Sequence, residues 1–164
     1  MKRLALILIP ITFLFLSCNK NRDVPSLNTS NNSDINFYKE KALKEGDTSA
    51  YNLLSLDYSD SPYEEFLPIA QEMADKHKYH LSYLDVYYCL TDYFHKKSYS
   101  ELEDLDYDKR KLAIKYLTLG AEKGNKDCQN ILGHIYINGK HLMKDTIKGN
   151  ELIRKSGYFK EKQN

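Results

Sequence analysis

Apolar side chains recur every three or four positions from Asp34 onward, and no stretch alternates polar and apolar residues as a strand does. A period of about 3.6 residues is typical of amphipathic helices that bury one face. The pattern therefore predicts an all-α fold of about seven helices, each of about 10 to 17 residues and joined by short turns. We expect this domain to extend over residues 34–158.

Capping residues mark the helix boundaries. The clearest start is Ser61-Pro62-Tyr63-Glu64, where a serine cap precedes a proline at the first helical position and a glutamate that returns the hydrogen bond. Further starts are expected at Asp34, Asp47, Tyr79, Asp106, Asn125 and Asp145. Stops are expected at Gly46, Gly124 and Gly139, because glycine adopts the left-handed turn that ends many helices.

The chain contains an internal repeat. Residues 45–58 align without a gap with residues 123–136, at a constant offset of 78 positions. The aligned pairs are Gly46 and Gly124, Ala50 and Cys128, Leu54 and Leu132, and Tyr58 and Tyr136. A weaker copy, 30 positions after the first, places His80, Leu84 and Tyr88 at the three helix positions. Repeated helix pairs that bury their apolar faces on one another are typical of stacked helical repeats.

The most regular copy lies within residues 106–158. Its first helix carries an alanine and an aromatic residue and leads through two small residues to Glu-x-Gly-Asn, and its second helix carries Leu-Gly-x-x-Tyr. This stretch resembles a Sel1-like repeat, and residues 34–58 and 62–95 carry degraded versions. The resemblance implies stacked helix-turn-helix pairs in a TPR-like α-solenoid. From Asp145 the chain resembles the opening helix of a truncated further repeat, which would cap the stack before a polar tail at residues 159–164.

Residue size suggests how the pairs pack. Small residues at Gly120, Ala121 and Gly133 would let two helix backbones approach closely, while large side chains fill the space between neighbouring pairs. The expected repeat-packing set is Tyr116, Gly120, Ala121, Gly124, Cys128, Leu132, Gly133 and Tyr136.

The N-terminus has the layout of a bacterial export signal over residues 1–17. Lys2 and Arg3 precede an apolar run at residues 4–16, which is shorter than the roughly 20 residues that a membrane-spanning helix needs. Leu14-Phe15-Leu16-Ser17-Cys18 resembles the lipobox of bacterial lipoproteins. The resemblance implies that Cys18 becomes the first residue and carries the lipid that anchors the protein to a membrane. Residues 18–33 then form the lipidated cysteine and a flexible tether rich in asparagine and serine.

Charge and cysteine content narrow the possible partners. Removal of residues 1–17 takes away Lys2 and Arg3 and leaves 22 basic against 23 acidic residues, so that no strong field attracts nucleic acid. Because basic and acidic residues alternate, there is also no basic stripe, and we expect no nucleic-acid partner. Cys89 and Cys128 can form a disulfide or lie in the core as two small residues, and the sequence does not decide between them.

Two features are candidates for contact with a partner. The spacing between repeat tyrosines lengthens from 30 to 48 residues after Tyr88, so residues 99–108 form an insertion that is both acidic and aromatic. The insertion is either a solvated turn or a partner contact through Glu101, Glu103 and Asp104. The second feature is a tyrosine stripe, in which Tyr83 and Tyr88 fit packing positions and Tyr79 and Tyr87 remain for solvent or a partner.

Known catalytic and metal-binding patterns do not fit. The acids at Asp104, Asp106 and Asp108 are not a calcium-binding loop, because lysines occupy the positions that need glycine and a bidentate acid. His77 and His80 are too few ligands for a metal. No nucleophile motif or phosphate-binding glycine loop occurs. We therefore expect no enzymatic activity and no cofactor.

Taken together, the sequence predicts a lipid-anchored, exported helical-repeat scaffold that mediates protein–protein interaction at the bacterial cell envelope. Asn19 after the cysteine implies, by the lipoprotein resemblance, the outer membrane with the domain facing the periplasm. One alternative is an immunity or inhibitor lipoprotein that neutralises a periplasmic toxin or enzyme. A weaker alternative is a cell-envelope glycan-binding module, whose tyrosines would stack on sugar rings.

Overall fold

The computed structural model describes residues 32–58, 63–91 and 102–158. The predicted signal segment, Cys18, most of the tether, the cap at Ser61 and Pro62, Glu101 and the polar tail lie outside these residues.

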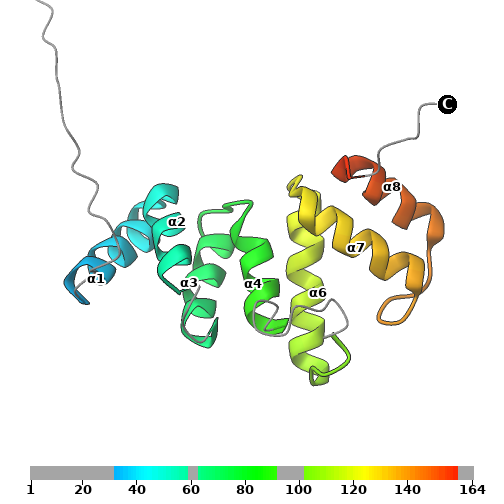
Figure 1. The fold of residues 1–164 in the computed structure, drawn as a ribbon, viewed down its shortest axis with the longest axis horizontal. Helices are drawn as coiled ribbons and strands as arrows, with labels where there is room; N and C mark the ends of the chain where they lie inside the picture. Colours follow the sequence, from blue (N-terminus) through cyan, green and yellow to red (C-terminus); the bar gives the residue numbers. More distant parts are fainter. Residues whose placement is uncertain (1–31, 59–62, 92–101, 159–164) are drawn as a thin grey trace, which may run out of the picture.

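The described chain is all-α, as predicted, with seven α-helices and no strand. The helices are α1 (Asn32–Glu40), continued by a π-helical segment η2 (Lys41–Glu45), then α2 (Thr48–Asp57), α3 (Tyr63–Asp75), α4 (Ser82–Thr91), α6 (Tyr107–Glu122), α7 (Lys126–Asn138) and α8 (Thr146–Ser156). Figure 1 shows them side by side in chain order, from α1 at one end to α8 at the other. The most extensive packing joins consecutive helices: α3 with α4, α4 with α6, α6 with α7 and α7 with α8. Each helix therefore buries its apolar face mainly on its neighbours in the sequence.

Four predicted helix starts are confirmed by side-chain caps. Each capping side chain accepts hydrogen bonds of 2.9 to 3.0 Å from backbone N–H groups in the first turn, which have no partner inside the helix. The caps are Asp47, Asp106, Asn125 and Asp145. One other start is displaced, since α4 begins at Ser82 rather than at Tyr79. Asp34 lies in the first turn of α1, which begins at the first described residue, Asn32.

The turns between paired helices share one backbone conformation. Gly46 and Gly124 have φ values of +70° and +83°, as their predicted role in left-handed turns requires. The matching position before α4 is Lys78, which has a φ value of +55°. Lys78 lies 32 positions after Gly46 and 46 positions before Gly124. A left-handed conformation is uncommon for a residue with a Cβ. The second copy of the repeat therefore carries the same turn without the glycine that marks it elsewhere.

This turn corrects the register of the second copy. An offset of 32 residues places Ser82, which is fully buried, at the position of Ala50 and Cys128, which are 3 % and 0 % exposed. The predicted offset of 30 is wrong, because it assigns this position to His80, which is exposed and precedes α4. All three second helices thus bury a small residue near their first turn.

Close backbone approach is confirmed at two of the predicted small residues. A Cβ on Gly120 would lie 2.5 Å from Cys128 Sγ, across the contact between α6 and α7. A Cβ on Gly133 would lie 2.8 Å from the carbonyl oxygen of Gly149, across the contact between α7 and α8. Both distances are shorter than carbon can tolerate, so these helices pack at their present separation only because glycine occupies these positions.

The other predicted packing residues divide into three groups. Tyr116, Ala121, Cys128 and Leu132 are buried, as predicted. Tyr136 is only partly buried, and Lys148 Nζ donates to its hydroxyl over 2.8 Å while lying 4.4 Å from the ring centroid. Gly124 is exposed and a Cβ there would meet nothing within 4 Å, so its role is the turn and its assignment to the packing set is wrong.

Candidate interaction surfaces

Tyrosine hydroxyls tie helices of different pairs together. Tyr51 of α2 donates to Asp85 Oδ2 of α4 over 2.7 Å, and Tyr116 of α6 donates to Asp75 Oδ2 of α3 over 2.8 Å. At the C-terminal end, the hydroxyl of Tyr158 donates to Asp127 Oδ1 of α7 over 2.6 Å. Since tyrosine combines an apolar ring with a polar tip, it can fill the space between helices and still fix their register.

The Tyr51–Asp85 bond is partly buried. Burial raises the pKa of Asp85 to about 6, and the hydrogen bond from Tyr51 opposes this rise. Burial and the neighbouring Asp85 also raise the pKa of Tyr51 far above its ordinary value. Burial likewise raises the pKa values of the Cys89 and Cys128 thiols. Both thiols are free and buried, so the two cysteines lie in the core as small residues rather than in a disulfide.

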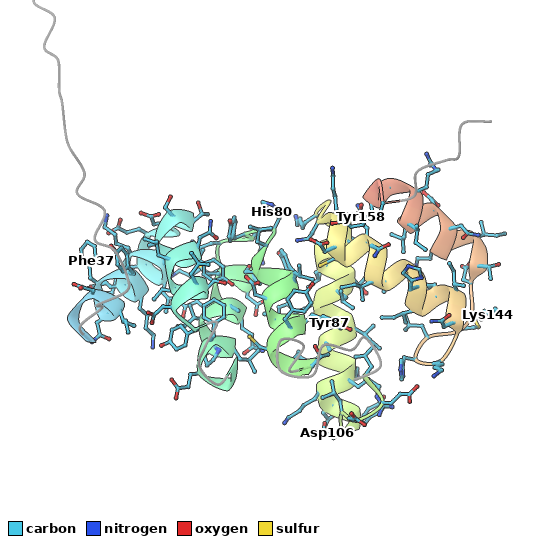
Figure 2. The ribbon with its side chains drawn as sticks, in the orientation of Figure 1. Phe37, His80, Tyr87, Asp106, Lys144 and Tyr158 are labelled. Atoms are coloured by element: carbon cyan, nitrogen blue, oxygen red, sulfur yellow. The ribbon has the colours of Figure 1, made fainter. Side chains whose placement is uncertain are left out.

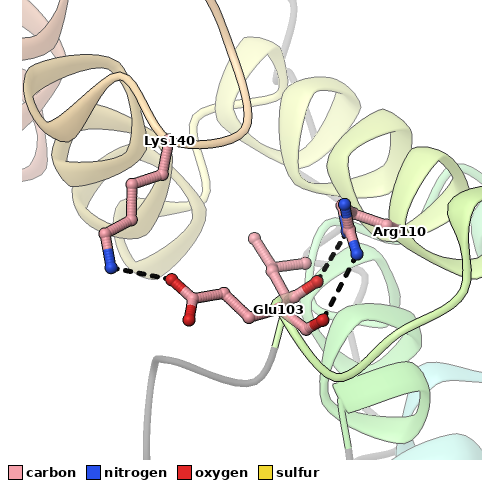
Figure 3. Close-up of polar contacts among 4 residues, drawn as sticks. Glu103, Arg110 and Lys140 are labelled. Carbon is pink, nitrogen blue, oxygen red and sulfur yellow. Dashed lines mark hydrogen bonds and ion pairs between the residues drawn. The ribbon is translucent and has the colours of Figure 1, made fainter.

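The insertion before α6 is fixed by one arginine. Arg110 donates from Nε to the carbonyl oxygen of Leu102 over 2.6 Å and from Nη2 to the carbonyl oxygen of Glu103 over 3.3 Å (Figure 3). Its Nη2 also donates to the carbonyl oxygen of Leu105 over 2.7 Å. The side chain of Leu102 is only 2 % exposed and is part of the core. The described part of the insertion is thus held by the buried side chain of Leu102 and by the hydrogen bonds from Arg110 to main-chain carbonyl groups.

Glu103 connects the insertion to the turn between α7 and α8. Its carboxylate accepts a hydrogen bond from Lys140 Nζ over 2.7 Å, and this bond holds the pKa of Glu103 below its ordinary value (Figure 3). Nearby, burial and the charge of Arg110 lower the pKa of His141. The Glu103 carboxylate is therefore engaged within the protein, and a partner would have to compete with Lys140 for it.

Five described residues of the insertion are exposed: Glu103, Asp104, Asp106, Tyr107 and Asp108. Tyr107, the first residue of α6, is 73 % exposed, and its two acidic neighbours are exposed as well. Asp106, by contrast, is occupied as the helix cap. Tyr107 is not among the residues predicted to contact a partner. The available signal was its position directly after a capping aspartate, where a first-turn side chain commonly faces solvent.

The two tyrosines expected to remain for a partner have different environments. Tyr79 is partly buried, its ring lies edge-on to Tyr51, and its hydroxyl donates to Asn52 Oδ1 over 3.1 Å. Tyr87 is 2 % exposed, so the expectation that it faces solvent is wrong. The reason is the two-residue error in the predicted register of the second copy, because the wrong offset assigns the buried face of α4 to residues other than Tyr87.

A cavity of about 140 Å³ lies between α4 and α7. It is lined by one residue of α4 and five of α7: Tyr87, Asn130, Ile131, His134, Ile135 and Asn138. Figure 2 shows Tyr87 between the ribbons of α4 and α6, on the side of α4 toward the C-terminal helices.

Among the residues that the structure describes, no three His, Cys, Asp or Glu side chains gather as metal ligands would. The same residues include no helix that is both long and apolar enough to cross a bilayer. In comparisons with known proteins, no family model, curated protein or solved structure matches this chain.

Proposed function

We propose that the protein is a lipid-anchored, exported helical-repeat scaffold of the Sel1-like type, which binds another protein at the bacterial cell envelope. Cys18 would carry the anchor, and the asparagine- and serine-rich residues after it would connect the anchor to the helical domain. The anchor would hold the domain at the outer membrane, facing the periplasm.

The observation that carries this proposal is the fixed insertion with its exposed tyrosine. A connection between two helices needs only a few residues. Here three hydrogen bonds from Arg110, one ion pair to Lys140 and the buried Leu102 hold residues 102–106 in place. A surface that is ordered before binding loses less conformational entropy when the partner arrives. Tyrosine is also among the residues that contribute most to binding when a partner buries them.

Charge indicates the kind of partner. Asp104 lies three positions before Tyr107 and Asp108 directly follows it, and both acids are exposed, so that a basic surface would complement them. The alternative of an immunity protein that blocks a basic active site relies on this same acidity. Of the four described acids of the insertion, Glu103 is paired with Lys140 and Asp106 caps α6, which leaves two for such a role.

The test is recovery of the partner from membranes. The full chain with a C-terminal tag would be purified in detergent, and the proteins retained by Tyr107→Ala and Asp104→Lys would be compared with those retained by the unaltered chain. We expect at least a tenfold loss of one stoichiometric partner, because burial of a single exposed tyrosine at an interface is worth about 2 kcal/mol. Glu122→Lys changes an exposed acid at the other end of α6 and is the matched control.

Three results would contradict the proposal. Retention of the partner by Tyr107→Ala would exclude the insertion as the contact. A partner that is a toxin or enzyme inactivated by the complex would favour the immunity alternative. Binding of envelope glycans without any protein would favour the glycan-binding alternative.

A further inference from the structure

The two most exposed of the large apolar side chains that the structure describes lie four positions apart, at the C-terminal end of the stack. Met143, in the turn between α7 and α8, is 89 % exposed, and Ile147, in the first turn of α8, is 83 % exposed. Apolar side chains scattered singly over a surface are ordinary. Two of them in one short segment, each with most of its surface in water, favour a contact that covers them both.

The turn that presents Met143 is fixed. Gly139 ends α7 in a left-handed conformation with a φ of +70°. The N–H of Asp145 donates to the carbonyl oxygen of Tyr136 over 3.0 Å. Leu142 is partly buried and packs on the core. The turn therefore directs Leu142 inward and leaves its neighbour Met143 in water.

The charge beside the two apolar side chains is positive. Lys144 directly follows Met143 and is exposed. Arg154 is also exposed and lies seven positions after Ile147, which places both on one face of α8 because seven residues make about two helical turns. We call Met143, Lys144, Ile147 and Arg154 the terminal surface.

The acids of this region are engaged within the protein. The carboxylate of Asp145 caps α8 and accepts a hydrogen bond of 2.9 Å from a backbone N–H of the first turn. Glu151 of the same helix forms an ion pair of 2.6 Å with Lys155. Because both acids are held by other groups, the charges of Lys144 and Arg154 face solvent.

A phospholipid bilayer with anionic headgroups complements this combination. Side chains as exposed as Met143 and Ile147 protrude from the protein, and a bilayer takes up protruding side chains without a cavity of matching shape. Apolar side chains enter the boundary between headgroups and acyl chains while the phosphates attract basic residues, and the two contributions add. A folded protein partner would need a pocket for each apolar side chain. Charge and protrusion together therefore favour the bilayer.

The terminal surface lies at the end of the stack opposite α1. Figure 2 shows Phe37 of α1 at one end and Lys144 at the other. We propose that the terminal surface docks on an anionic phospholipid bilayer, with its two apolar side chains among the headgroups and its lysine and arginine against lipid phosphates. Two separate contacts hold a protein at a membrane more firmly than one. The inference rests on the proposed function for the anchor, which brings the domain to the bilayer.

The test uses tryptophan as a probe, because the chain contains none. The full chain with Met143→Trp would be reconstituted into vesicles of phosphatidylcholine, with or without phosphatidylglycerol, whose acyl chains carry bromine. Bromine quenches tryptophans that reach the acyl chains. We expect the emission to shift to shorter wavelength and to be quenched only where phosphatidylglycerol is present. Leu56→Trp replaces an exposed leucine that precedes the acid Asp57 and is the matched control, for which we expect no quenching.

Charge substitutions test the role of the basic residues. Each basic residue near an anionic surface changes binding about fivefold. Lys144→Gln combined with Arg154→Gln, in the chain with Met143→Trp, should therefore reduce the quenching to the level in phosphatidylcholine alone. Lys126→Gln changes an exposed lysine of α7 and should leave the quenching unchanged. All of these side chains are exposed, and circular dichroism would verify that the helices are retained.

The inference fails if Met143→Trp is quenched in neither kind of vesicle, is quenched equally in both, or stays quenched after the two glutamine substitutions. A shift without quenching that grows with the ratio of protein to vesicles would indicate contact with a second copy, and it would also overturn the inference. The failure of the proposed function is distinguishable, because recovery of the partner depends on Tyr107 and the quenching does not.

Discussion

Asp85→Asn is expected to stabilise the protein at neutral pH. Asp85 is partly buried on α4, and its carboxylate accepts a hydrogen bond from the Tyr51 hydroxyl over 2.7 Å. Asparagine has nearly the same shape, and its side-chain oxygen can still accept this bond. The substitution therefore removes the buried charge and leaves the connection between α2 and α4 in place.

The magnitude follows from the pKa. Burial raises the pKa of Asp85 from 3.8 to about 6. A shift of about two pH units corresponds to about 3 kcal/mol. Since the folded pKa lies above the unfolded one, the unfolded state binds fewer protons in this window, and the free energy of unfolding falls as the pH rises from about 4 to about 6. This decrease in the free energy of unfolding is complete above about pH 7, and about 2 kcal/mol of the decrease occurs between pH 4.5 and 7.5.

The assay is chemical denaturation of both proteins at several pH values. The difference in free energy of unfolding, variant minus unaltered chain, isolates Asp85 from the other carboxylates, and it should rise by about 2 kcal/mol between pH 4.5 and 7.5. Asp75→Asn is the matched control, because Asp75 accepts the Tyr116 hydroxyl over 2.8 Å but is exposed. There we expect no gain in stability at neutral pH. A difference for Asp85→Asn that does not change with pH would refute the reasoning.

Three further predictions concern packing, the insertion and the anchor. Gly133→Ala should lower the free energy of unfolding by about 1–3 kcal/mol, because its Cβ would lie 2.8 Å from the Gly149 carbonyl oxygen. An effect no larger than that of Asn150→Ala in the same denaturant titration would contradict the close approach. Arg110→Ala should speed amide hydrogen exchange in residues 102–106, and unchanged exchange would show that the insertion is held by other means. Cys18→Ser should move the protein from the membrane to the soluble fraction in cell fractionation, whereas retention in the membrane would contradict lipid anchoring.

Several parts of the fold could be predicted because their signals are local. A capping side chain bonds to N–H groups two or three residues away, so the caps at Asp47, Asp106, Asn125 and Asp145 needed no knowledge of the tertiary structure. Glycine likewise marks a left-handed turn by itself. The 78-residue offset relates α2 to α7, which are the second helices of the first and third pairs. It is visible in the sequence for the same reason, since both copies carry a cap and a glycine.

The second copy was misplaced because it lacks both signals. Lys78 adopts the left-handed turn in place of glycine, and α4 has no capping aspartate or asparagine at Tyr79. The turn is stabilised instead by Ser82, whose hydroxyl donates to the Tyr79 carbonyl over 2.6 Å. The resulting two-residue shift changed which side chains of α4 were expected in the core, and this is why Tyr87 was assigned to the surface.

The site geometry depends on contacts that leave no local pattern. Arg110 bonds to main-chain carbonyls five to eight residues earlier, and any residue supplies such a carbonyl. The pairing of Glu103 with Lys140 spans 37 residues and requires the turn after α7 to lie beside the insertion. The cavity lined by Tyr87 and by residues of α7 follows only from the position of α4 beside α7.

The account depends most on one claim, that the exposed tyrosine of the fixed insertion contacts a protein partner. A photo-crosslinking amino acid would replace Tyr107 in the full chain in living cells, and in a parallel culture it would replace Glu122 on the same helix. Irradiation should give one dominant adduct in the membrane fraction from position 107 and none from position 122. The absence of an adduct at position 107, or the same adducts at both positions, would contradict the claim.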